Sequence, residues 1–266
     1  MRLQNYFSES RLFFGKRLTV RRIYMIESNH IQMGMSQVSI STPQLLRRQI
    51  EALVRESLGR RVGALGLGGA LVGRVSSDLV VNSSARHMHI SPENLEILFG
   101  VGAELTVHKM LYQEGQFASQ QTVTLIGPRK RIIPNLRILG PCRNLTQIEL
   151  AFTDAVQLGM DIPVRMSGDI EGTPGAYVMG PKGMLEMRNG VIRAARHVHM
   201  SPEDAQFYEV KHLDRITLKV TSPGCTTRLE DLIVRVDASF KLEVHIDTDE
   251  ANGCDLERAT KVELIR

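Results

Sequence analysis

Short segments in which apolar and polar residues alternate recur from about residue 78 to the end of the chain. Residues 122–127 (TVTLIG), 214–218 (DRITL) and 232–237 (LIVRVD) are examples, and all are rich in Val, Ile, Leu and Thr. Alternation with a period of two and an excess of β-branched residues are typical of half-buried strands. Turn-forming sequences such as GPCRN (140–144) and TSPG (221–224) separate the segments. The pattern predicts a mainly β fold with short helices.

One motif of this region occurs twice. Residues 85–93 read ARHMHISPE, and residues 195–203 read ARHVHMSPE. We therefore expect two tandem related β-barrel domains, residues 78–187 and 188–266, with one short helix in each. The similarity continues past the shared motif, because strand-like segments also align: AELTV (103–107) with DRITL (214–218), and TVTLIG (122–127) with LIVRVD (232–237).

A helical pattern precedes the repeat. In residues 43–60 the apolar side chains recur at helical spacing on one face, at Leu45, Leu46, Ile50, Leu53, Val54 and Leu58. Thr42 and Pro43 suit the N-cap and the first helical position, and a Gly-rich linker (63–73) follows. An amphipathic helix on a tether is expected to dock onto a partner, with packing on its own domain as the alternative. Residues 1–77 are thus predicted to form an N-terminal extension.

The composition and charge of the chain argue against a nucleic-acid or membrane partner. The chain has 266 residues, is 42% hydrophobic and carries a net charge of +4, and many of its arginines precede residue 62. The first 33 residues show no period and are read either as a basic tail or as a region upstream of a start at Met33 or Met35. No aromatic residues alternate with these charges, so a nucleic-acid partner is not expected. Three cysteines without a CxxC motif indicate a reducing compartment, and no apolar run or signal-peptide pattern indicates a membrane partner.

The repeated histidines are candidate metal ligands. His87 and His89 stand two apart at a predicted strand end, so both imidazoles face the same side, and His197 and His199 repeat the arrangement. Paired imidazoles at such spacing are typical zinc donors. The Ser-Pro-Glu that follows each pair supplies an N-cap, a first helical residue and a first-turn acid, so each strand is expected to lead into a helix.

A cupin-like metalloenzyme is an alternative interpretation of the first copy. His87, His89, Glu93 and Gly100 match the spacing of the cupin metal motif. In that motif the glutamate is a ligand on a strand, whereas the N-cap and Pro92 place Glu93 in a helix, facing away from the histidines. The second copy has Val210 where the glycine would stand. Both features argue against the cupin interpretation.

Two histidines need further donors to hold a zinc ion. Residues 241–247 (KLEVHID) alternate as a strand, which puts Glu243, His245 and Asp247 on one face, and His245 is the candidate third ligand. Residues 144–150 (NLTQIEL) also read as a strand and offer Glu149. Cys142 has no visibly paired base, so we do not expect it to act as a nucleophile.

Several separated motifs in this order resemble the PduL-type phosphotransacylases, or phosphate propanoyltransferases, of bacterial microcompartments. The resemblance covers about residues 78–266 and includes, beside the two histidine motifs, LGPCRNLTQIE, SGDIEGTPG and VHIDTDEANG. It implies two related β-barrel domains and reversible conversion of a short-chain acyl-CoA and phosphate to acyl phosphate and CoA. It also implies two zinc ions per chain, one held by His87, His89 and Glu149 and the other by His197, His199 and His245.

The resemblance further implies substrate-binding residues and partners. Arg143 would bind phosphate, Ser167 would line the site, and the basic turn 127–131 (GPRKR) is a weaker candidate for the CoA phosphates. Acyl-CoA, CoA and phosphate would be the small-molecule partners. The helix 43–60 resembles an encapsulation peptide, which implies contact with shell or core proteins, a location in the lumen of a cytoplasmic microcompartment and a role in propanediol degradation. The same helix could drive formation of a homo-oligomer.

Two matters stay open at this point. The preferred acyl group is not determined, because acetyl, propanoyl and butanoyl groups differ by one or two methylenes, each worth about 1–3 kcal/mol in a pocket. A non-catalytic, metal-stabilised binding or shell-adaptor protein is the alternative from another functional class. Arg143 and Glu149 argue against it, because a structural zinc needs neither an unpaired arginine nor an open coordination position.

Overall fold

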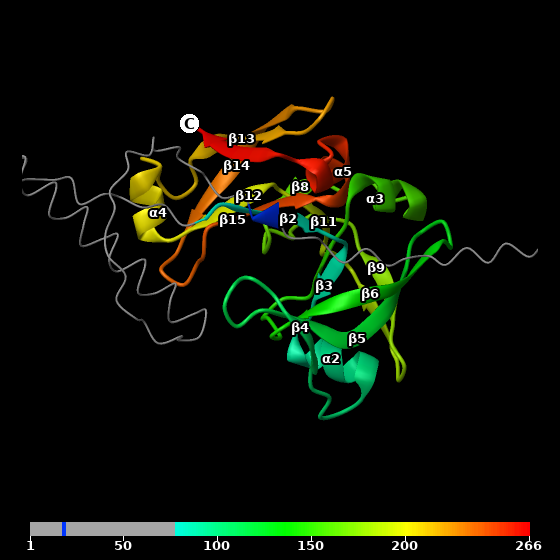
Figure 1. The fold of residues 1–266 in the computed structure, drawn as a ribbon. Coiled ribbons are helices and arrows are strands. Elements are labelled where there is room, and N and C mark those ends of the chain that lie inside the picture. The colour runs from blue at the N-terminus through cyan, green and yellow to red at the C-terminus, as the bar shows by residue number, and fades with distance from the viewer. Residues whose placement is uncertain (1–17, 20–77) are drawn as a thin grey trace, which may run out of the picture. The chain divides into compact units, whose positions relative to one another are not determined.

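The computed structural model describes residues 18–19 and 78–266. This part of the chain is mainly β, with two curled sheets of seven and nine strands and four short α-helices. The expectation of a mainly β fold with short helices is therefore confirmed. In Figure 1, β13 and β14 lie in the upper part of the molecule, and β4, β5 and α2 lie in the lower part. The predicted helix 43–60 and its Gly-rich linker lie outside the described residues.

The nine-stranded sheet is built mostly from the first half of the repeat. In the order of pairing its strands are β10 (Met184–Met187), β9 (Ala176–Met179), β5 (Phe117–Ile126), β6 (Ile132–Gly140), β3 (His87–His89), β7 (Gln147–Glu149), β11 (Val191–Ala194) and β8 (Val164–Arg165), with β4 (Val107–Met110) paired to β5. The helices α2 (Pro92–Phe99) and α3 (Phe152–Leu158) belong to this half.

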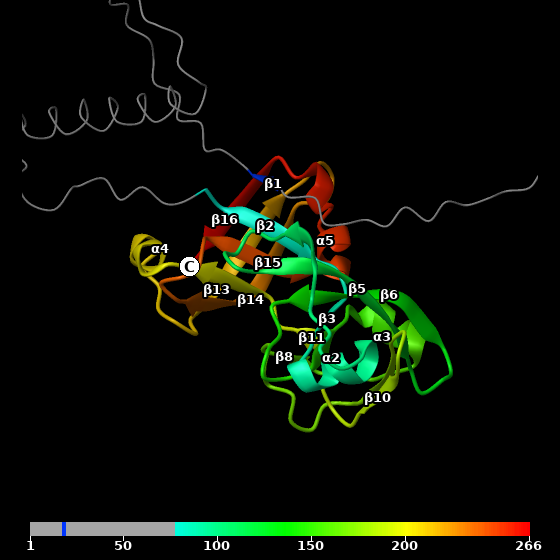
Figure 2. The ribbon, with the colours of Figure 1, turned by 90° about the horizontal axis from the view of Figure 1, so that it is seen from below.

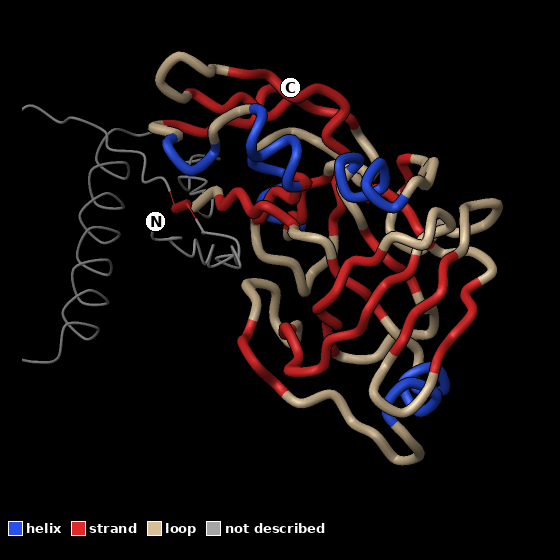
Figure 3. Tube along the Cα trace, turned by 90° about the vertical axis from the view of Figure 1, so that its right-hand side faces the viewer, coloured by secondary structure: helices blue, strands red, loops and turns tan. Residues whose placement is uncertain are grey.

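The seven-stranded sheet is built mostly from the second half. In the order of pairing its strands are β1 (Leu18–Thr19), β2 (Val80–Ser84), β15 (Glu243–Asp247), β12 (His197–Met200), β14 (Thr227–Val236), β13 (Arg215–Thr221) and β16 (Lys261–Ile265). The helices α4 (Pro202–Phe207) and α5 (Thr248–Gly253) and the short 3-10 helix η1 (Leu256–Arg258) complete this half. Figure 3 shows the helices in blue beside the red strands. Within the described part of the chain, no helix has the length and apolar character needed to cross a membrane.

The two sheets share a five-strand arrangement that is completed by exchange of strands between the halves. The common order is β5-β6-β3-β7-β11 in one sheet and β13-β14-β12-β15-β2 in the other. β2 leads directly into β3 in sequence, yet it pairs in parallel with β15, beside which it lies in Figure 2. β11 likewise precedes β12 but pairs in parallel with β7. Each half therefore gives its first strand to the sheet of the other half, and the predicted division at residues 187 and 188 is not a boundary between sheets.

The topology corrects two details of the sequence analysis. β6 and β14 are the parallel neighbours of the two histidine strands, and β5 and β13 are their hairpin partners. Residues 214–218 fall mostly in β13, whose equivalent is β5 and not residues 103–107. Residues 232–237 fall mostly in β14, whose equivalent is β6, whereas residues 122–127 fall mostly in β5. Each half also holds two helices rather than one. The alignment was wrong because alternation alone does not identify which strand pairs with which.

The alternation within the histidine strands fixes which side chains meet the core. Met88 and Val198 are fully buried in the two hydrophobic clusters, and each stands between the two histidines of its strand. Because successive side chains of a strand point to opposite faces, the histidines face away from these clusters. A slip of one residue would expose the apolar side chains, each worth roughly 1.5–3 kcal/mol when buried, and would bury the imidazoles.

Both predicted Ser-Pro helix starts are confirmed. The hydroxyl of Ser91 accepts a hydrogen bond from the amide of Asn94 at the start of α2. Ser201 accepts one from the amide of Asp204 and forms a reciprocal capping box with it at the start of α4. Each histidine strand is thus stopped and turned within two residues of its second imidazole, which holds that imidazole at the end of the strand.

Candidate functional site

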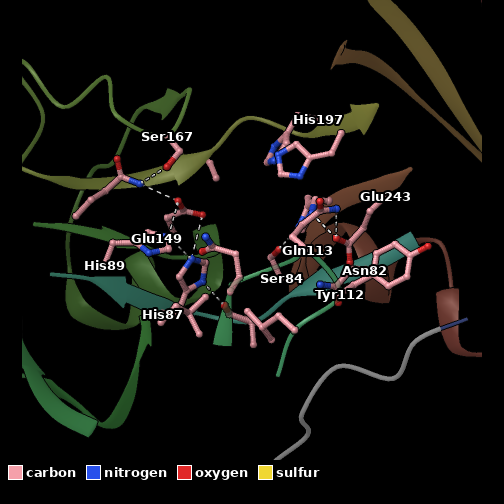
Figure 4. Close-up of a pocket in the computed structure, with 18 of the residues that line it drawn as sticks. Asn82, Ser84, His87, His89, Tyr112, Gln113, Glu149, Ser167, His197 and Glu243 are labelled. Carbon is pink, nitrogen blue, oxygen red and sulfur yellow. Dashed lines mark hydrogen bonds and ion pairs between the residues drawn. The ribbon is translucent and has the colours of Figure 1, made fainter. Parts of the chain in front are cut away.

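A cavity of about 600 Å³ lies between the two sheets and receives side chains from both halves. Its lining includes both histidine pairs, Glu149 and His245, and also Arg143 and Ser167. Figure 4 shows His87, His89 and Glu149 on one side of the cavity and His197 and Glu243 on the other. The structure therefore brings all eight predicted site residues to one cavity, although they are spread over 159 positions of the chain.

The first cluster consists of His87, His89 and Glu149. The Nε2 atoms of the two histidines are 3.2 Å apart, and Glu149 oxygens lie 3.4 Å from His87 Nε2 and 3.8 Å from His89 Nε2. Sheet register causes this approach, because His87 stands directly opposite Glu149 in the antiparallel pair of β3 and β7. The three side chains thus direct one donor atom each toward a common point.

The second cluster consists of His197, His199 and His245. His197 stands directly opposite His245 in the antiparallel pair of β12 and β15, so the register of the first cluster is repeated. The ring centroids of the three imidazoles are 4.8–4.9 Å apart, and their nearest donor atoms all lie within 4.8 Å of one another. Glu149 and His245 are therefore equivalent positions of the repeat that carry different donors, a carboxylate in one half and an imidazole in the other.

The backbone orients the first imidazole of each pair. His87 Nδ1 lies 2.8 Å from the carbonyl oxygen of Ala85, and His197 Nδ1 lies 2.9 Å from that of Ala195. A carbonyl only accepts, so Nδ1 of each ring carries the proton and donates it, and Nε2 keeps its lone pair. A hydrogen bond of this kind from the far nitrogen is the usual support of a metal-binding histidine.

Burial keeps three of the imidazoles neutral, those of His89, His197 and His199. It lowers the pKa of His197 to about 3 and that of His199 to about 2, and the neighbouring His245 adds to both shifts. Burial also lowers the pKa of His89, together with repulsion from His87 and Arg143. Neutral imidazoles can bind a cation directly, because no proton has to leave first.

Glu149 is the carboxylate of the site. Burial alone would raise its pKa, but His87, His197 and Arg143 outweigh that effect and hold the pKa below the usual value. Gln147 Nε2 donates to a Glu149 oxygen at 2.7 Å and to Ser167 Oγ at 2.9 Å, and Gln147 Oε1 accepts from the amide of Gly168 at 2.7 Å. Gln147 therefore links the carboxylate to the loop that carries Ser167.

Arg143 lies in the wall of the same cavity. Its guanidinium is 3.5 Å from Ser167 Oγ and 3.5 Å from Gln116 Oε1, which are long contacts for a cation. Its side chain remains in contact with water but sits in a recess of the protein, and this partial removal from solvent lowers its pKa. Glu149 attracts it through space, without an ion pair between the two groups in the described residues. Arg143 is therefore placed to meet an anion that enters the cavity.

Several lining residues carried too weak a sequence signal to be singled out. Arg235 and Phe240 flank His199, and Gln113 binds the buried Glu243 at 2.7 Å from the other half of the molecule. Gln147 was not singled out either, although the period of two along β7 places it on the same face as Glu149. Nothing in the sequence joins Gln113 to Glu243, which lies in a distant strand.

The structure also separates the remaining candidates from the site. Glu93 is exposed in the first turn of α2 and does not belong to the first donor cluster, which argues against the cupin interpretation. The basic turn 127–131 does not line the cavity, whereas Arg86, Lys109 and Arg137 do. Burial raises the pKa of the Cys142 thiol, so little thiolate is present at neutral pH.

Comparison with known proteins gives one consistent result. The family model for phosphate propanoyltransferase matches residues 80–257, which include both histidine clusters. A phosphate propanoyltransferase of Planctopirus limnophila is 52% identical over 235 residues, which are 87% of this chain and 96% of the relative. One of Thermotoga maritima is 47% identical over 192 residues, which are 72% of this chain and 91% of the relative. One of Salmonella typhimurium is 44% identical over 170 residues, which are 64% of this chain and 80% of the relative.

The match extends over the two sheets, the cavity between them and both donor clusters, at identities well above those at which only a fold is shared. The relatives are acyltransferases that act with phosphate, as their names state. On these grounds the chain belongs to the phosphate propanoyltransferase family of enzymes.

Proposed function

We propose that this enzyme transfers a propanoyl or acetyl group reversibly between coenzyme A and inorganic phosphate, with the help of two zinc ions. The observation that supports the proposal is the presence of two three-donor clusters and Arg143 in a single cavity. In the forward direction a phosphate oxygen attacks the thioester carbonyl, the carbon–sulfur bond breaks, and CoA leaves as a thiolate that takes up a proton. Acyl phosphate and CoA are the products.

The donor sets fit zinc. Zinc in proteins is commonly bound by imidazole nitrogens and a carboxylate about 2.0–2.2 Å away, in a tetrahedral arrangement that puts donors about 3.3 Å apart. The donor atoms of the first cluster are 3.2–3.8 Å apart. Both buried ring nitrogens of His199 have no hydrogen-bond partner among the described residues, so one of them is free to bind a cation. Three protein donors also leave one tetrahedral position for a substrate.

The first zinc would be held by His87, His89 and Glu149, and the second by His197, His199 and His245. When bound, zinc ions supply Lewis acidity, which stabilises the thiolate of CoA and the charge on phosphate and the carbonyl oxygen. The protein groups contribute orientation. Ala85 and Ala195 fix two imidazoles through their carbonyls, and Gln147 holds Glu149 in place.

Arg143 is proposed to bind the attacking phosphate. A guanidinium forms paired hydrogen bonds to phosphate oxygens, and it stays charged even where burial lowers its pKa. Ser167 lies beside it and is suited to accept or donate a further hydrogen bond. No covalent acyl-enzyme is needed, which agrees with the raised pKa of Cys142.

We propose in addition that the predicted helix 43–60 is an encapsulation peptide. The support is the apolar face seen in its sequence and the Gly-rich linker that follows. The helix would bind a shell or core protein of a bacterial microcompartment and deliver the enzyme to its lumen, where propanediol degradation is the proposed setting. Fusion of residues 1–77 to a fluorescent protein tests this role. Uniform fluorescence in cells that assemble microcompartments would refute it.

The catalytic proposal is tested by following the thioester absorbance of propanoyl-CoA with purified full-length protein. We expect loss of absorbance that requires phosphate, is abolished by chelation and returns with zinc. Arg143→Ala should lower turnover roughly 100-fold or more while zinc content is unchanged. Arg228→Ala, on an exposed part of β14 away from the cavity, is the matched control. Zinc-loaded, folded protein that leaves acetyl-, propanoyl- and butanoyl-CoA intact would favour the binding-protein alternative.

A further inference from the structure

Arg235 belongs to the cavity through the register of the second sheet. It stands on β14 directly beside His199, its partner in the parallel pair of β12 and β14. Its guanidinium carbon lies 5.8 Å from the centre of the Phe240 ring, and that ring in turn stacks on His199 at 4.1 Å. Both Arg235 and Phe240 line the cavity. The guanidinium is therefore held at the second donor cluster, next to an aromatic face that suits a cation.

Among the described residues, Arg235 makes no hydrogen bond and no ion pair. Other arginines of the region are paired: Arg86 binds Asp154 at 2.6 Å, Arg193 binds Glu250 at 2.8 Å, and Arg137 donates to the carbonyl of Ser119 at 2.5 Å. Arg235 is half-buried, and its removal from solvent lowers its pKa. Glu149 and Asp237 attract it through space without an ion pair, so an anion that enters the cavity would be its first direct hydrogen-bonding partner.

The repeat shows that the sheet itself does not need an arginine here. His87 is paired with Arg137 on β6, and His197 is paired with Ile233 on β14, so Arg137 and Ile233 are equivalent. Leu139 and Arg235 each lie two residues after this pair on their strands, so Leu139 is the equivalent of Arg235. The first half thus forms the same strand with leucine, and the charge of Arg235 has no counterpart in the architecture.

Arg235 also shares its electrostatic surroundings with Arg143. The charge of Arg235 contributes to the lowered pKa of Arg143, and both guanidinium groups are attracted by Glu149. Two further carboxylates act here: Glu243 lines the cavity 3.1 Å from His245, and the exposed Asp237 attracts Arg235. Neither carboxylate forms an ion pair with Arg235 or Arg143 in the described residues, and two bound metal ions would give this part of the cavity an excess of positive charge. A dianion is the complementary ligand.

We propose that Arg235 is a second phosphate-binding residue, which holds phosphate or the phosphoryl group of acyl phosphate from the side of the second donor cluster while Arg143 holds it from the first. This inference rests on the proposed function and assigns a substrate contact within it. Two guanidinium groups from different halves would fix the orientation of the phosphate relative to the thioester carbonyl.

Phosphoryl oxygens could reach Arg235 from two sources, inorganic phosphate or acyl phosphate on the one hand and the phosphates of CoA on the other. Steady-state kinetics of the full-length, zinc-loaded enzyme separate them. For Arg235→Ala we expect the KM for phosphate to rise about 10- to 100-fold, as for loss of a charge-assisted hydrogen bond, with the KM for propanoyl-CoA nearly unchanged. Arg235→Lys, which keeps the charge but not the paired donors, should lie between Arg235→Ala and the parent enzyme.

A binding measurement complements the kinetics. Phosphate should raise the melting temperature of the parent enzyme and of Arg228→Ala, and should do so less for Arg235→Ala. Arg228 lies on the same strand, is exposed and does not line the cavity, so it controls for loss of an arginine from β14. If Arg235→Ala does not fold, the comparison of Arg235→Lys with the parent enzyme decides the matter.

The outcomes distinguish this inference from the proposed function. An active parent enzyme whose KM for phosphate is unchanged in Arg235→Ala would overturn the role of Arg235 and leave the proposed function intact. A rise in the KM for propanoyl-CoA alone would assign Arg235 to CoA and also overturn it. A parent enzyme without phosphate-dependent turnover would refute the proposed function, and the phosphate-induced shift in melting temperature would still test whether Arg235 binds the anion.

Discussion

Arg86 and Arg196 occupy matching positions, each directly before the first histidine of a pair, and each guanidinium binds a carboxylate in the first half of a neighbouring helix. Arg86 lies 2.6 Å from Asp154 in α3, and Arg196 lies 2.8 Å from Glu250 in α5. Both helices follow the strand that carries the third donor of the cluster. The two ion pairs therefore tie each histidine strand to the chain just beyond its third donor.

Arg86→Ala should destabilise the protein by about 1–3 kcal/mol, because it leaves the largely buried carboxylate of Asp154 without its partner. Urea unfolding followed by circular dichroism measures the change. Arg215→Ala removes an ion pair whose side chains are 64% and 72% exposed, and it should cost at most about 1 kcal/mol. Equal effects of the two substitutions would show that burial of the Arg86 pair carries no energetic weight.

The zinc content of single-histidine variants should show that the two clusters bind zinc independently. The parent protein is expected to bind two equivalents of zinc, and His89→Ala and His199→Ala should each retain one, because each removes a donor from a different cluster. Inductively coupled plasma mass spectrometry measures the content after dialysis. His212→Ala is the control, since the exposed His212 accepts a hydrogen bond from the amide of Val236 and belongs to neither cluster. Loss of both equivalents from either variant would contradict independent sites.

Cys142→Ser should keep turnover within about a factor of three of the parent enzyme. Burial raises the pKa of this thiol, so it is not a ready nucleophile. The same assay with propanoyl-CoA and phosphate measures the rate, and iodoacetamide treatment gives an independent check. A burst of CoA release before steady state that vanishes in the variant would instead indicate an acyl-cysteine intermediate.

Gly180→Ala tests the packing of a hairpin against α2. A Cβ at this position would lie 2.4 Å from the carbonyl oxygen of Leu98 and 2.8 Å from its Cβ, so the turn between β9 and β10 has to shift. We expect a loss of about 1–3 kcal/mol in thermal or urea unfolding. Gly253→Ala, at the end of α5 with nothing within 4 Å, should be neutral or stabilise the protein by up to about 1 kcal/mol.

The local parts of the site were predictable because they depend on short-range rules. The period of two placed His87 beside His89, and the N-cap and Pro92 showed where the strand had to end. The same period presented Glu149 and His245 as candidate donors on other strands. The position of Glu149 opposite His87 depends on the register between β3 and β7, and no residue of either strand predicts that register.

The exchange of strands and part of the helical structure could not be read from the chain. β2 and β11 each begin with two apolar residues, and this pattern does not say which of the two sheets each strand completes. Helix α3 begins after Ala151, which provides no side-chain cap, and its start therefore had no sequence signal. Helix α5 did have one, the Asp247–Glu250 capping box, and it was missed because Asp247 was counted with the preceding strand.

The exchange of β2 and β11 restricts how this enzyme can open. In a two-domain enzyme joined by a hinge, the halves swing apart to admit substrates. Here each half contributes one strand to the sheet of the other half. Before the halves could separate, these strands would have to lose their hydrogen bonds to β7 and β15. Acyl-CoA and phosphate are therefore expected to enter a preformed cavity through its opening, and only side chains and loops around that opening can move to admit them.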